Sequence, residues 1–134
     1  MINKNNAEHY VWGQNCDGWH LVKADGLSFI HARMPPAASE VRHLHRVSRQ
    51  FFFVLSGTAT LEVDGKRETL QAHQGREVAP GVPHQMFNDS GSETEFLVMS
   101  QPPSYGDRVL VSDPAQSPSR LLGQEQAETD AYLE

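Results

Sequence analysis

Cysteine is almost absent from this sequence of 134 residues, where Cys16 is its single representative. One cysteine can form no disulfide within the chain and cannot supply a multi-cysteine zinc site, so a reducing compartment fits best. Long hydrophobic runs are missing as well. No segment approaches the about 20 apolar residues that span a bilayer, and residues 1–20 lack an apolar core of signal-peptide length. We therefore expect a cytoplasmic protein with no membrane partner.

Basic residues are in deficit. The chain carries 11 Lys and Arg against 17 Asp and Glu, which gives a formal net charge of −6 at pH 7. This balance argues against nucleic acids and anionic membrane surfaces as partners, because both repel a negatively charged protein. The expected partners are a small-molecule ligand and a second copy of the chain in a homodimer. Trp12 and Trp19 are candidate contact residues for that dimer, because aromatic anchors dominate interfaces. The alternative is that they pack over the exterior of the domain.

Long amphipathic helices, internal repeats and low-complexity tracts are also missing. From about Trp19 to Gln101, short apolar or alternating runs are separated by Gly, Pro, Asp and Ser, which is the pattern of an antiparallel β domain. The expected strands are Trp19–Val22, Leu27–Met34, Glu40–His45, Gln50–Leu55, Thr58–Val63, Arg67–Leu70, Glu77–Val78, His84–Asn88 and Glu93–Ser100. Asp64-Gly65 predicts a two-residue hairpin turn, because both positions of a type I′ turn need positive φ.

The apolar run Phe51–Leu55 has no polar face. Period 2 puts Phe52 and Val54 on one side of a strand and the other residues on the opposite side, so both sides need cover. A second sheet, a closed barrel or a dimer partner would provide it. The length predicts one domain, and the change in composition places it at residues 1–110, as a β-barrel domain with N-terminal strands. A polar, Pro- and Ser-containing C-terminal extension follows at residues 111–134. That extension is either partly helical or a frayed, disordered tail.

Two short stretches carry the chemistry. Alternation in Glu40–His45 places His43 and His45 on one face, and Gln50 opens the next strand after a short connection. His84 begins a distant strand directly after Pro83. If these strands pack together, three imidazoles and one side-chain amide line one cavity, which is a donor set for a mononuclear metal site. The remaining histidines are expected to be ordinary hydrogen-bonded residues: His9, His20, His31 and His73.

At these residues the chain resembles a single-domain cupin. The first cupin motif, G-x5-H-x-H-x3,4-E-x6-G, is matched by His43, His45, Gln50 and Gly57, and the second, G-x5-P-x-G-x2-H-x3-N, by Gly81, His84 and Asn88. The resemblance covers roughly residues 25–100 and implies an all-β double-stranded β-helix, a barrel of jelly-roll type. The chain departs from the motifs where the opening glycine is missing, where Ala79 takes a proline position, and where Gln50 replaces the usual glutamate.

This replacement makes all the expected metal ligands neutral: His43, His45, Gln50 and His84. The full divalent charge then stays on the metal, which polarises a bound carbonyl, enol or water more strongly and attracts anionic ligands. Imidazole-rich sites favour one divalent transition metal ion, such as Zn, Ni, Fe, Mn or Cu, over Mg or Ca.

The surroundings of the metal are expected to be partly apolar. Candidate lining residues are Phe29, Phe52, Met86, Met34 and Met99, although each is more often a simple core residue than a ligand contact. Acid–base candidates are Glu40, His31, Tyr105 and Asp107. Arg49 is expected at the surface. The segment Ser100–Arg108 is a candidate cover for the barrel mouth, in which Asp107 and Arg108 serve either as a structural clasp or as substrate contacts.

Three functions are consistent with these motifs. The first is a metal-dependent isomerase or lyase that acts as a Lewis acid on a sugar-like or keto/enol metabolite. The spacing is similar to that of cupins that linearise and ketonise unsaturated uronates, but the apolar stretch Glu95–Ser100 gives no reason to transfer their substrate. The second is an Fe(II)-dependent cupin dioxygenase, and the third a non-catalytic ligand-binding cupin.

Overall fold

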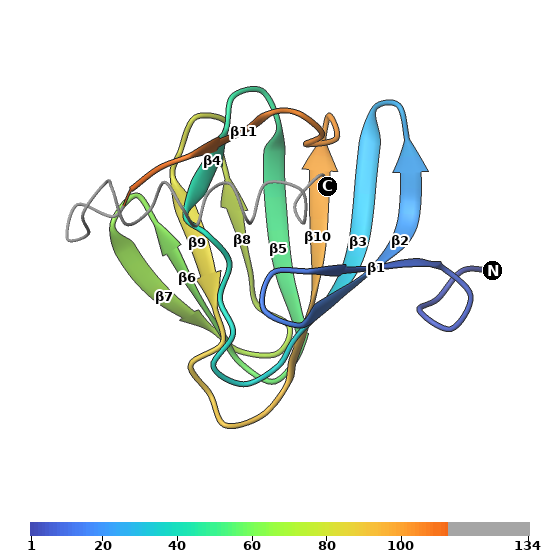
Figure 1. Cartoon of the computed structure of the whole chain (residues 1–134), viewed down its shortest axis with the longest axis horizontal. Coiled ribbons are helices and arrows are strands. Elements are labelled where there is room, and N and C mark those ends of the chain that lie inside the picture. The colour runs from blue at the N-terminus through green and yellow to red at the C-terminus, as the bar shows by residue number, and fades with distance from the viewer. Residues whose placement is uncertain (113–134) are drawn as a thin grey trace.

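Eleven strands and no helix make up residues 1–112, the part of the chain that the computed structural model describes (Figure 1). The strands are β1 (Glu8–Trp12), β2 (Cys16–Ala24), β3 (Leu27–Met34), β4 (His43–His45), β5 (Arg49–Ser56), β6 (Ala59–Val63), β7 (Lys66–Leu70), β8 (Gly75–Val78), β9 (His84–Phe87), β10 (Thr94–Gln101) and β11 (Arg108–Leu110). The fold is therefore all-β, as predicted. The helix or frayed tail expected in the extension concerns residues that lie almost entirely outside the described range.

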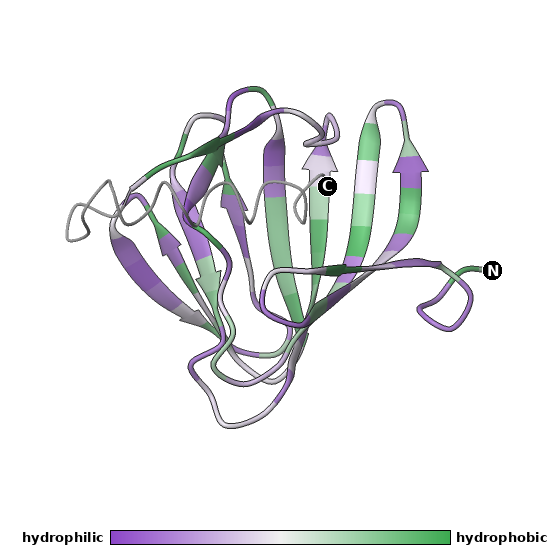
Figure 2. Ribbon diagram, viewed as in Figure 1, coloured by the Kyte–Doolittle hydropathy of each residue, from purple (hydrophilic) through white to green (hydrophobic). Residues whose placement is uncertain are grey.

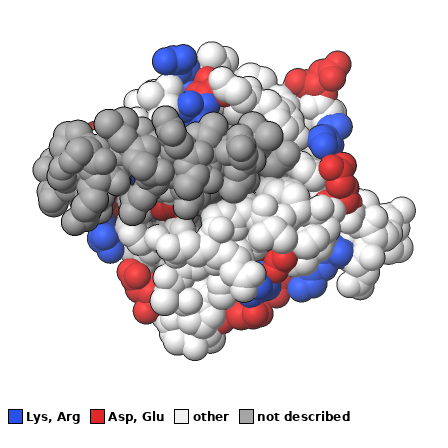
Figure 3. Space-filling view, in the orientation of Figure 1, with Lys and Arg blue, Asp and Glu red and all other residues white. Residues whose placement is uncertain are grey.

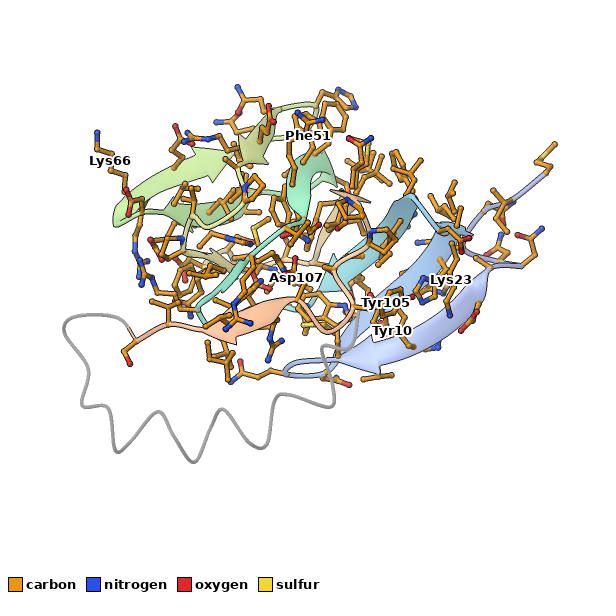
Figure 4. All side chains as sticks on the ribbon, turned by 90° about the horizontal axis from the view of Figure 1, so that it is seen from above. Tyr10, Lys23, Phe51, Lys66, Tyr105 and Asp107 are labelled. Carbon is orange, nitrogen blue, oxygen red and sulfur yellow. The ribbon has the colours of Figure 1, made fainter. Side chains whose placement is uncertain are left out.

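The strands form two antiparallel sheets that face each other as a jelly-roll barrel. One sheet has the order β1-β2-β3-β10-β5-β8 and the other the order β11-β4-β9-β6-β7. The edge strands β1 and β11 lie on the same side of the molecule, one from each sheet (Figures 1 and 4). Within residues 1–112, no helix has the length and hydropathy that crossing a membrane requires.

The hairpin turn is confirmed. β6 and β7 pair with Val63 opposite Lys66, and the two turn residues between them, Asp64 and Gly65, have φ values of 52° and 90°. This is the left-handed region that a type I′ turn requires, and asparagine, aspartate and glycine tolerate it best.

Strand alternation builds the core and corrects two lining residues. On β3, Ile30 and Ala32 point inward and are buried, whereas Phe29 lies on the outer face and is only half-buried. On β10, Phe96 is buried and Met99 faces outward. The expectation that Phe29 and Met99 line the cavity was therefore wrong. Successive side chains of a strand point to opposite faces, and the inward positions are those next to these two residues. Figure 2 shows the hydrophobic residues concentrated on β3, β5 and β10.

The outer face of the six-stranded sheet keeps apolar side chains. Phe51 is 36% exposed, and Phe53 and Leu97 are half-buried. Charged groups of both signs also lie at this surface as ion pairs, such as Lys4 with Glu95 at 3.0 Å. On the part of the face in Figure 3 that is not drawn in grey, blue and red groups lie near one another and form no continuous basic stripe. The homodimer stays a prediction.

Asn88 closes the loop that follows β9. It is fully buried, and its amide nitrogen donates to the carbonyl oxygens of Met34, Pro35 and Ser92 at 2.8–3.2 Å. Its amide oxygen accepts hydrogen bonds from Ser90. The asparagine of the second motif thus fastens the backbone directly after the last residue of β9, at one end of the barrel.

Candidate metal centre

Three strands carry the predicted donors to one point inside the barrel. His43 and His45 occupy the inward positions of β4, and His84 opens β9 directly opposite His43 in the β4–β9 pairing. Gln50 enters from β5 in the other sheet. All four side chains are buried, between 1% and 7% exposed. The strand β4 begins at His43 rather than at Glu40, but the alternation that puts both histidines on one face is as expected.

The three imidazoles form a compact cluster. One ring nitrogen from each of His43, His45 and His84 lies within 4.8 Å of the other two, which is close enough for all three to hold a single ion. The ring centroids are 4.9 Å apart for His43 and His45 and 4.5 Å apart for His43 and His84. Among residues 1–112 this is the cluster of histidine, cysteine and acidic side chains that could bind a metal ion.

Burial keeps these histidines neutral. It lowers the pKa of His43 well below its usual value, with further contributions from the charges of His84 and His45. Burial and the charge of His84 also lower the pKa of His45, to about 4, and burial lowers the pKa of His84. Neutral imidazole is the form that binds a metal, so at pH 7 no proton has to be removed first.

Backbone carbonyls decide which nitrogen of two rings carries the proton. Nδ1 of His43 lies 2.8 Å from the carbonyl oxygen of Val41, and Nδ1 of His84 lies 3.0 Å from that of Val82. A carbonyl oxygen can only accept, and a neutral imidazole has one N–H, so this N–H must be at Nδ1. Nε2 of both rings therefore presents a lone pair to the interior. Such outer hydrogen bonds are typical of metal-binding histidines.

Gln50 adds an oxygen donor, its side-chain amide oxygen, to the imidazole nitrogens. Its amide oxygen Oε1 lies 3.1 Å from Nε2 of His84, while its amide nitrogen donates to Oγ of Ser100 at 3.0 Å. With the His84 proton on Nδ1, two electron-rich atoms face each other at this distance without a hydrogen between them. A cation bound to both would turn this repulsion into attraction. The donor chemistry fits a divalent transition metal, and ligation by Gln50 stays a prediction.

The metal-free protein is expected to lose stability as the pH falls. The folded-state pKa of His45 is about 4 and the unfolded value is 6.5, so the unfolded chain binds more protons between them. The stabilisation is complete above pH 6.5 and is lost as the pH falls toward 4, which for His45 is roughly 3 kcal/mol. Urea unfolding of chelator-treated protein across this range measures the loss.

His45→Gln provides the matched comparison, because an amide at this position does not titrate. The variant should show a shallower decrease of unfolding free energy below pH 6.5 than the wild-type chain. Equal slopes for the two proteins would contradict the depressed pKa of His45.

A pocket extends from the histidines between the two sheets. Its apolar wall includes Trp12, Ile30, Phe52, Met86, Phe96 and Val98. Phe52 and Met86 were expected there, whereas Met34 is buried in the core but does not line the pocket. Trp12 is only 7% exposed, and its indole N–H donates to the carbonyl of Asp17 at 2.9 Å. The expectation of Trp12 as a dimer contact is therefore corrected: it lies inside, on the pocket wall.

Arg108 brings a positive charge to the same pocket. It stands opposite His45 in the β11–β4 pairing, and opposite residues of an antiparallel pair share one face. Both of its terminal nitrogens are buried, and its charge contributes to lowering the pKa of His45 and His43. From the sequence, two roles were expected for Arg108, a structural clasp or a substrate contact. The structure places it on the pocket wall, beside the histidines.

Of the four acid–base candidates, Glu40 lines the pocket, and its carboxylate accepts the backbone N–H of Met86 at 2.9 Å. His31 instead lies on the outer face, 2.6 Å from Glu95. Tyr105 is 42% exposed at the surface, on the segment between β10 and β11 (Figure 4).

Asp107 is a structural clasp. Its carboxylate accepts backbone N–H groups from Arg46, Val47 and Ser48 at 2.8–3.1 Å, and these hydrogen bonds help lower its pKa. It therefore ties the start of β11 to the turn that joins β4 to β5. This turn separates the histidine pair from Gln50, so Asp107 holds the ligand-bearing strands in place from outside.

The other histidines lie apart from the cluster. His9 pairs with Asp17 at 2.7 Å and His31 with Glu95, both toward the surface. His20 stacks on Tyr10, with ring centroids 5.0 Å apart, and His73 is an exposed turn residue. Arg49 is exposed, as expected. It donates a hydrogen bond to Gln101 and forms an ion pair with Glu77.

The chain belongs to the cupin family: a family model for the cupin domain matches residues 30–100. Solved structures with the same fold include KdgF from Halomonas sp., at 12% identity and a TM-score of 0.71, covering 77% of this chain and 93% of that one. A sugar phosphate isomerase of the cupin superfamily from Silicibacter pomeroyi has 18% identity, a TM-score of 0.67 and coverages of 77% and 76%. The polyketide cyclase RemF from Streptomyces resistomycificus has 18% identity, a TM-score of 0.71 and coverages of 100% and 98%. No curated protein matches the sequence.

Proposed function

We propose that this cupin is a metal-dependent enzyme of isomerase or lyase type that acts on a keto/enol metabolite with an acidic group. The observation that carries the proposal is the combination of neutral donors with an arginine whose two terminal nitrogens are buried in the same pocket. Three neutral imidazoles and the Gln50 amide supply no negative charge, and the positive charge of Arg108 offsets the carboxylate of Glu40, so the divalent charge of a bound metal would stay uncompensated. An anionic ligand that can chelate is the natural complement of such a pocket.

Each residue has a defined task in this proposal. His43, His45, His84 and Gln50 hold the metal, which, when bound, acts as a Lewis acid on a carbonyl or enol oxygen. Arg108 binds the acidic group of the substrate by charge-assisted hydrogen bonds. Glu40 is the carboxylate of the pocket and our candidate for moving a proton between carbon and oxygen. Trp12, Phe52 and Phe96 keep water away from these groups.

The pocket wall favours a keto/enol metabolite over a sugar-like one. Sugars need many hydrogen-bonding partners, whereas much of this wall is aromatic or aliphatic and its polar groups lie near the histidines. An enolisable diketone has few oxygen atoms, and these can meet the metal site while its carbon skeleton contacts the apolar wall. The full-length likeness to a polyketide cyclase is in keeping with this choice, although at 18% identity it concerns the fold.

An Fe(II)-dependent dioxygenase is the second candidate. The same apolar wall and the three-histidine cluster favour it, because neither supplies a ligand that would exclude iron. The third reading, a non-catalytic binder, uses the same pocket without turnover. All three bind an anionic chelating ligand, so binding alone does not separate them.

One experiment separates these functions. The full chain, loaded in turn with Zn, Ni, Mn or Fe(II), is mixed with acetylpyruvate, an enolisable diketone that carries a carboxylate. We expect the metal-loaded protein to speed the relaxation of the enol's ultraviolet absorbance to its new keto–enol equilibrium after a pH jump, without oxygen uptake. Oxygen uptake by the Fe(II)-loaded protein would favour the dioxygenase and contradict the isomerase. Binding without turnover, for this probe and related diketone acids, would identify a ligand-binding cupin.

A further inference from the structure

Ser100 lies against the one ligand that distinguishes this site from the usual cupin motif. It occupies the end of β10, is 2% exposed and faces Gln50 in the β10–β5 pairing. Its Oγ accepts the amide N–H of Gln50 at 3.0 Å, and no other described residue bonds this oxygen. The side chain of Gln50 therefore sits between Ser100 on its nitrogen side and His84 on its oxygen side.

A glutamine ligand has a difficulty that a glutamate ligand does not. The two ends of a carboxylate are equivalent, whereas an amide binds a metal through oxygen only, and its reversal turns an N–H toward the site. In the reversed orientation that N–H would donate to the lone pair on Nε2 of His84. One rotation would thus remove the oxygen donor and occupy a histidine donor at the same time.

We propose that Ser100 is a positioning residue that makes the Gln50 amide usable as a metal ligand. With the oxygen toward His84, the amide N–H points away from the site into a buried region, where an N–H without an acceptor is unfavourable. The Oγ of Ser100 is the acceptor that meets it. Gln50 and Ser100 therefore work as a pair, whereas a glutamate at position 50 does not need the serine to set its orientation, because its two oxygens are equivalent. This inference rests on the proposed metal site but on no particular reaction.

A double-mutant cycle tests the pair. Metal affinity is measured for the wild-type chain, Ser100→Ala, Gln50→Glu and the double variant, by competition with a chromophoric chelator for Zn²⁺ and Co²⁺. We expect Ser100→Ala to weaken binding about 10- to 100-fold with glutamine at position 50, which is the range for losing an outer hydrogen-bond partner of a ligand. With glutamate at position 50 the same change should weaken binding clearly less, because either carboxylate oxygen can face the metal and only the hydrogen bond from the hydroxyl to the outer oxygen is lost.

Ser28→Ala is the matched control. Ser28 is the β3 partner of Ser100 in the β10–β3 pairing and is equally buried, at 2% exposure, but it does not contact Gln50. This variant removes a similar hydroxyl from the same layer of the barrel and should leave metal affinity unchanged. A second readout is the visible absorption of the Co²⁺ form, which should change in Ser100→Ala because a donor is lost, and remain unchanged in Ser28→Ala.

Two results would overturn the proposal. An equal loss of affinity from Ser100→Ala in both backgrounds would make the serine a general structural residue. No loss with glutamine at position 50 would mean that the amide is held without it. Neither result affects the proposed function, which fails instead if the wild-type chain binds no transition metal or turns over no keto/enol substrate.

Discussion

Replacing His45 by alanine is expected to abolish stoichiometric binding of a transition metal. The three ring nitrogens lie within 4.8 Å of one another, so one ion can use all three, and removing one leaves an incomplete set. The loss should exceed the roughly 10- to 100-fold effect of an outer-shell substitution. Elemental analysis after dialysis against the metal gives the stoichiometry, and equilibrium competition gives the affinity.

The control for this experiment is His31→Ala. His31 is a half-buried histidine of the neighbouring sheet whose ring bonds Glu95 on the outer face, away from the cluster. This variant should keep one metal ion per chain. Circular dichroism of both variants without metal separates loss of the ion from loss of the fold. One retained ion in folded His45→Ala would refute the three-histidine centre.

Part of the histidine cluster could be predicted from the sequence, because the placement of two of its side chains follows from strand alternation alone. Period 2 along a strand places His43 and His45 on one face whatever surrounds them, and the motif spacing sets His84 on a second strand. The hairpin at Asp64-Gly65 is equally local, because its φ values are set by the two turn residues. The approach of His84 to the histidine pair depends on the pairing of β4 with β9, which the resemblance to the two cupin motifs implied and strand alternation alone did not.

The walls of the pocket could not be predicted from the sequence by such local rules. None of the expected strand ranges covers β1 or β11, yet these two strands contribute Trp12 and Arg108 to the pocket. Both are edge strands, β11 is only three residues long, and it pairs with β4 across a long sequence separation. Gly18 on β2 shows why β1 is hard to predict. A Cβ at this position would lie 2.4 Å from the ring of Tyr10 on β1, and the alternation of residues along a strand does not reveal this close contact.

The inward face of β3 was also predicted wrongly, because the sequence alone does not show which face of this strand borders the pocket. Size and hydrophobicity favour Phe29 as the inward residue, but the small residues Ser28 and Ala32 face inward with Ile30. Small side chains on this strand are consistent with a barrel that keeps an open pocket beside its histidine cluster, whereas a large aromatic side chain there would reduce that space. The sequence rule that places the largest apolar residues inside applies to a filled core and is less reliable for a barrel with a cavity.

Arg108→Met is expected to weaken binding of an acidic diketone selectively. Loss of a charge-assisted hydrogen bond costs roughly 1.5–3 kcal/mol, so the dissociation constant of acetylpyruvate should rise about 10- to 150-fold. Acetylacetone has the same chelating diketone without the carboxylate and should bind the variant and the wild-type protein within about threefold of each other. Titration of the Co²⁺-loaded protein, followed by its visible absorption, compares the two probes.

Arg49→Met is the matched control, because Arg49 is an exposed arginine near Gln50 whose partners, Gln101 and Glu77, lie at the surface. It should leave the affinity for both probes unchanged. Methionine retains the length of the arginine stem, and β11 should keep its place because the clasp at Asp107 uses backbone N–H groups of Arg46, Val47 and Ser48. An equal loss of both probes in Arg108→Met would show that the arginine supports the metal site as a whole. A selective loss of acetylpyruvate would assign to Arg108 the recognition of the acidic group.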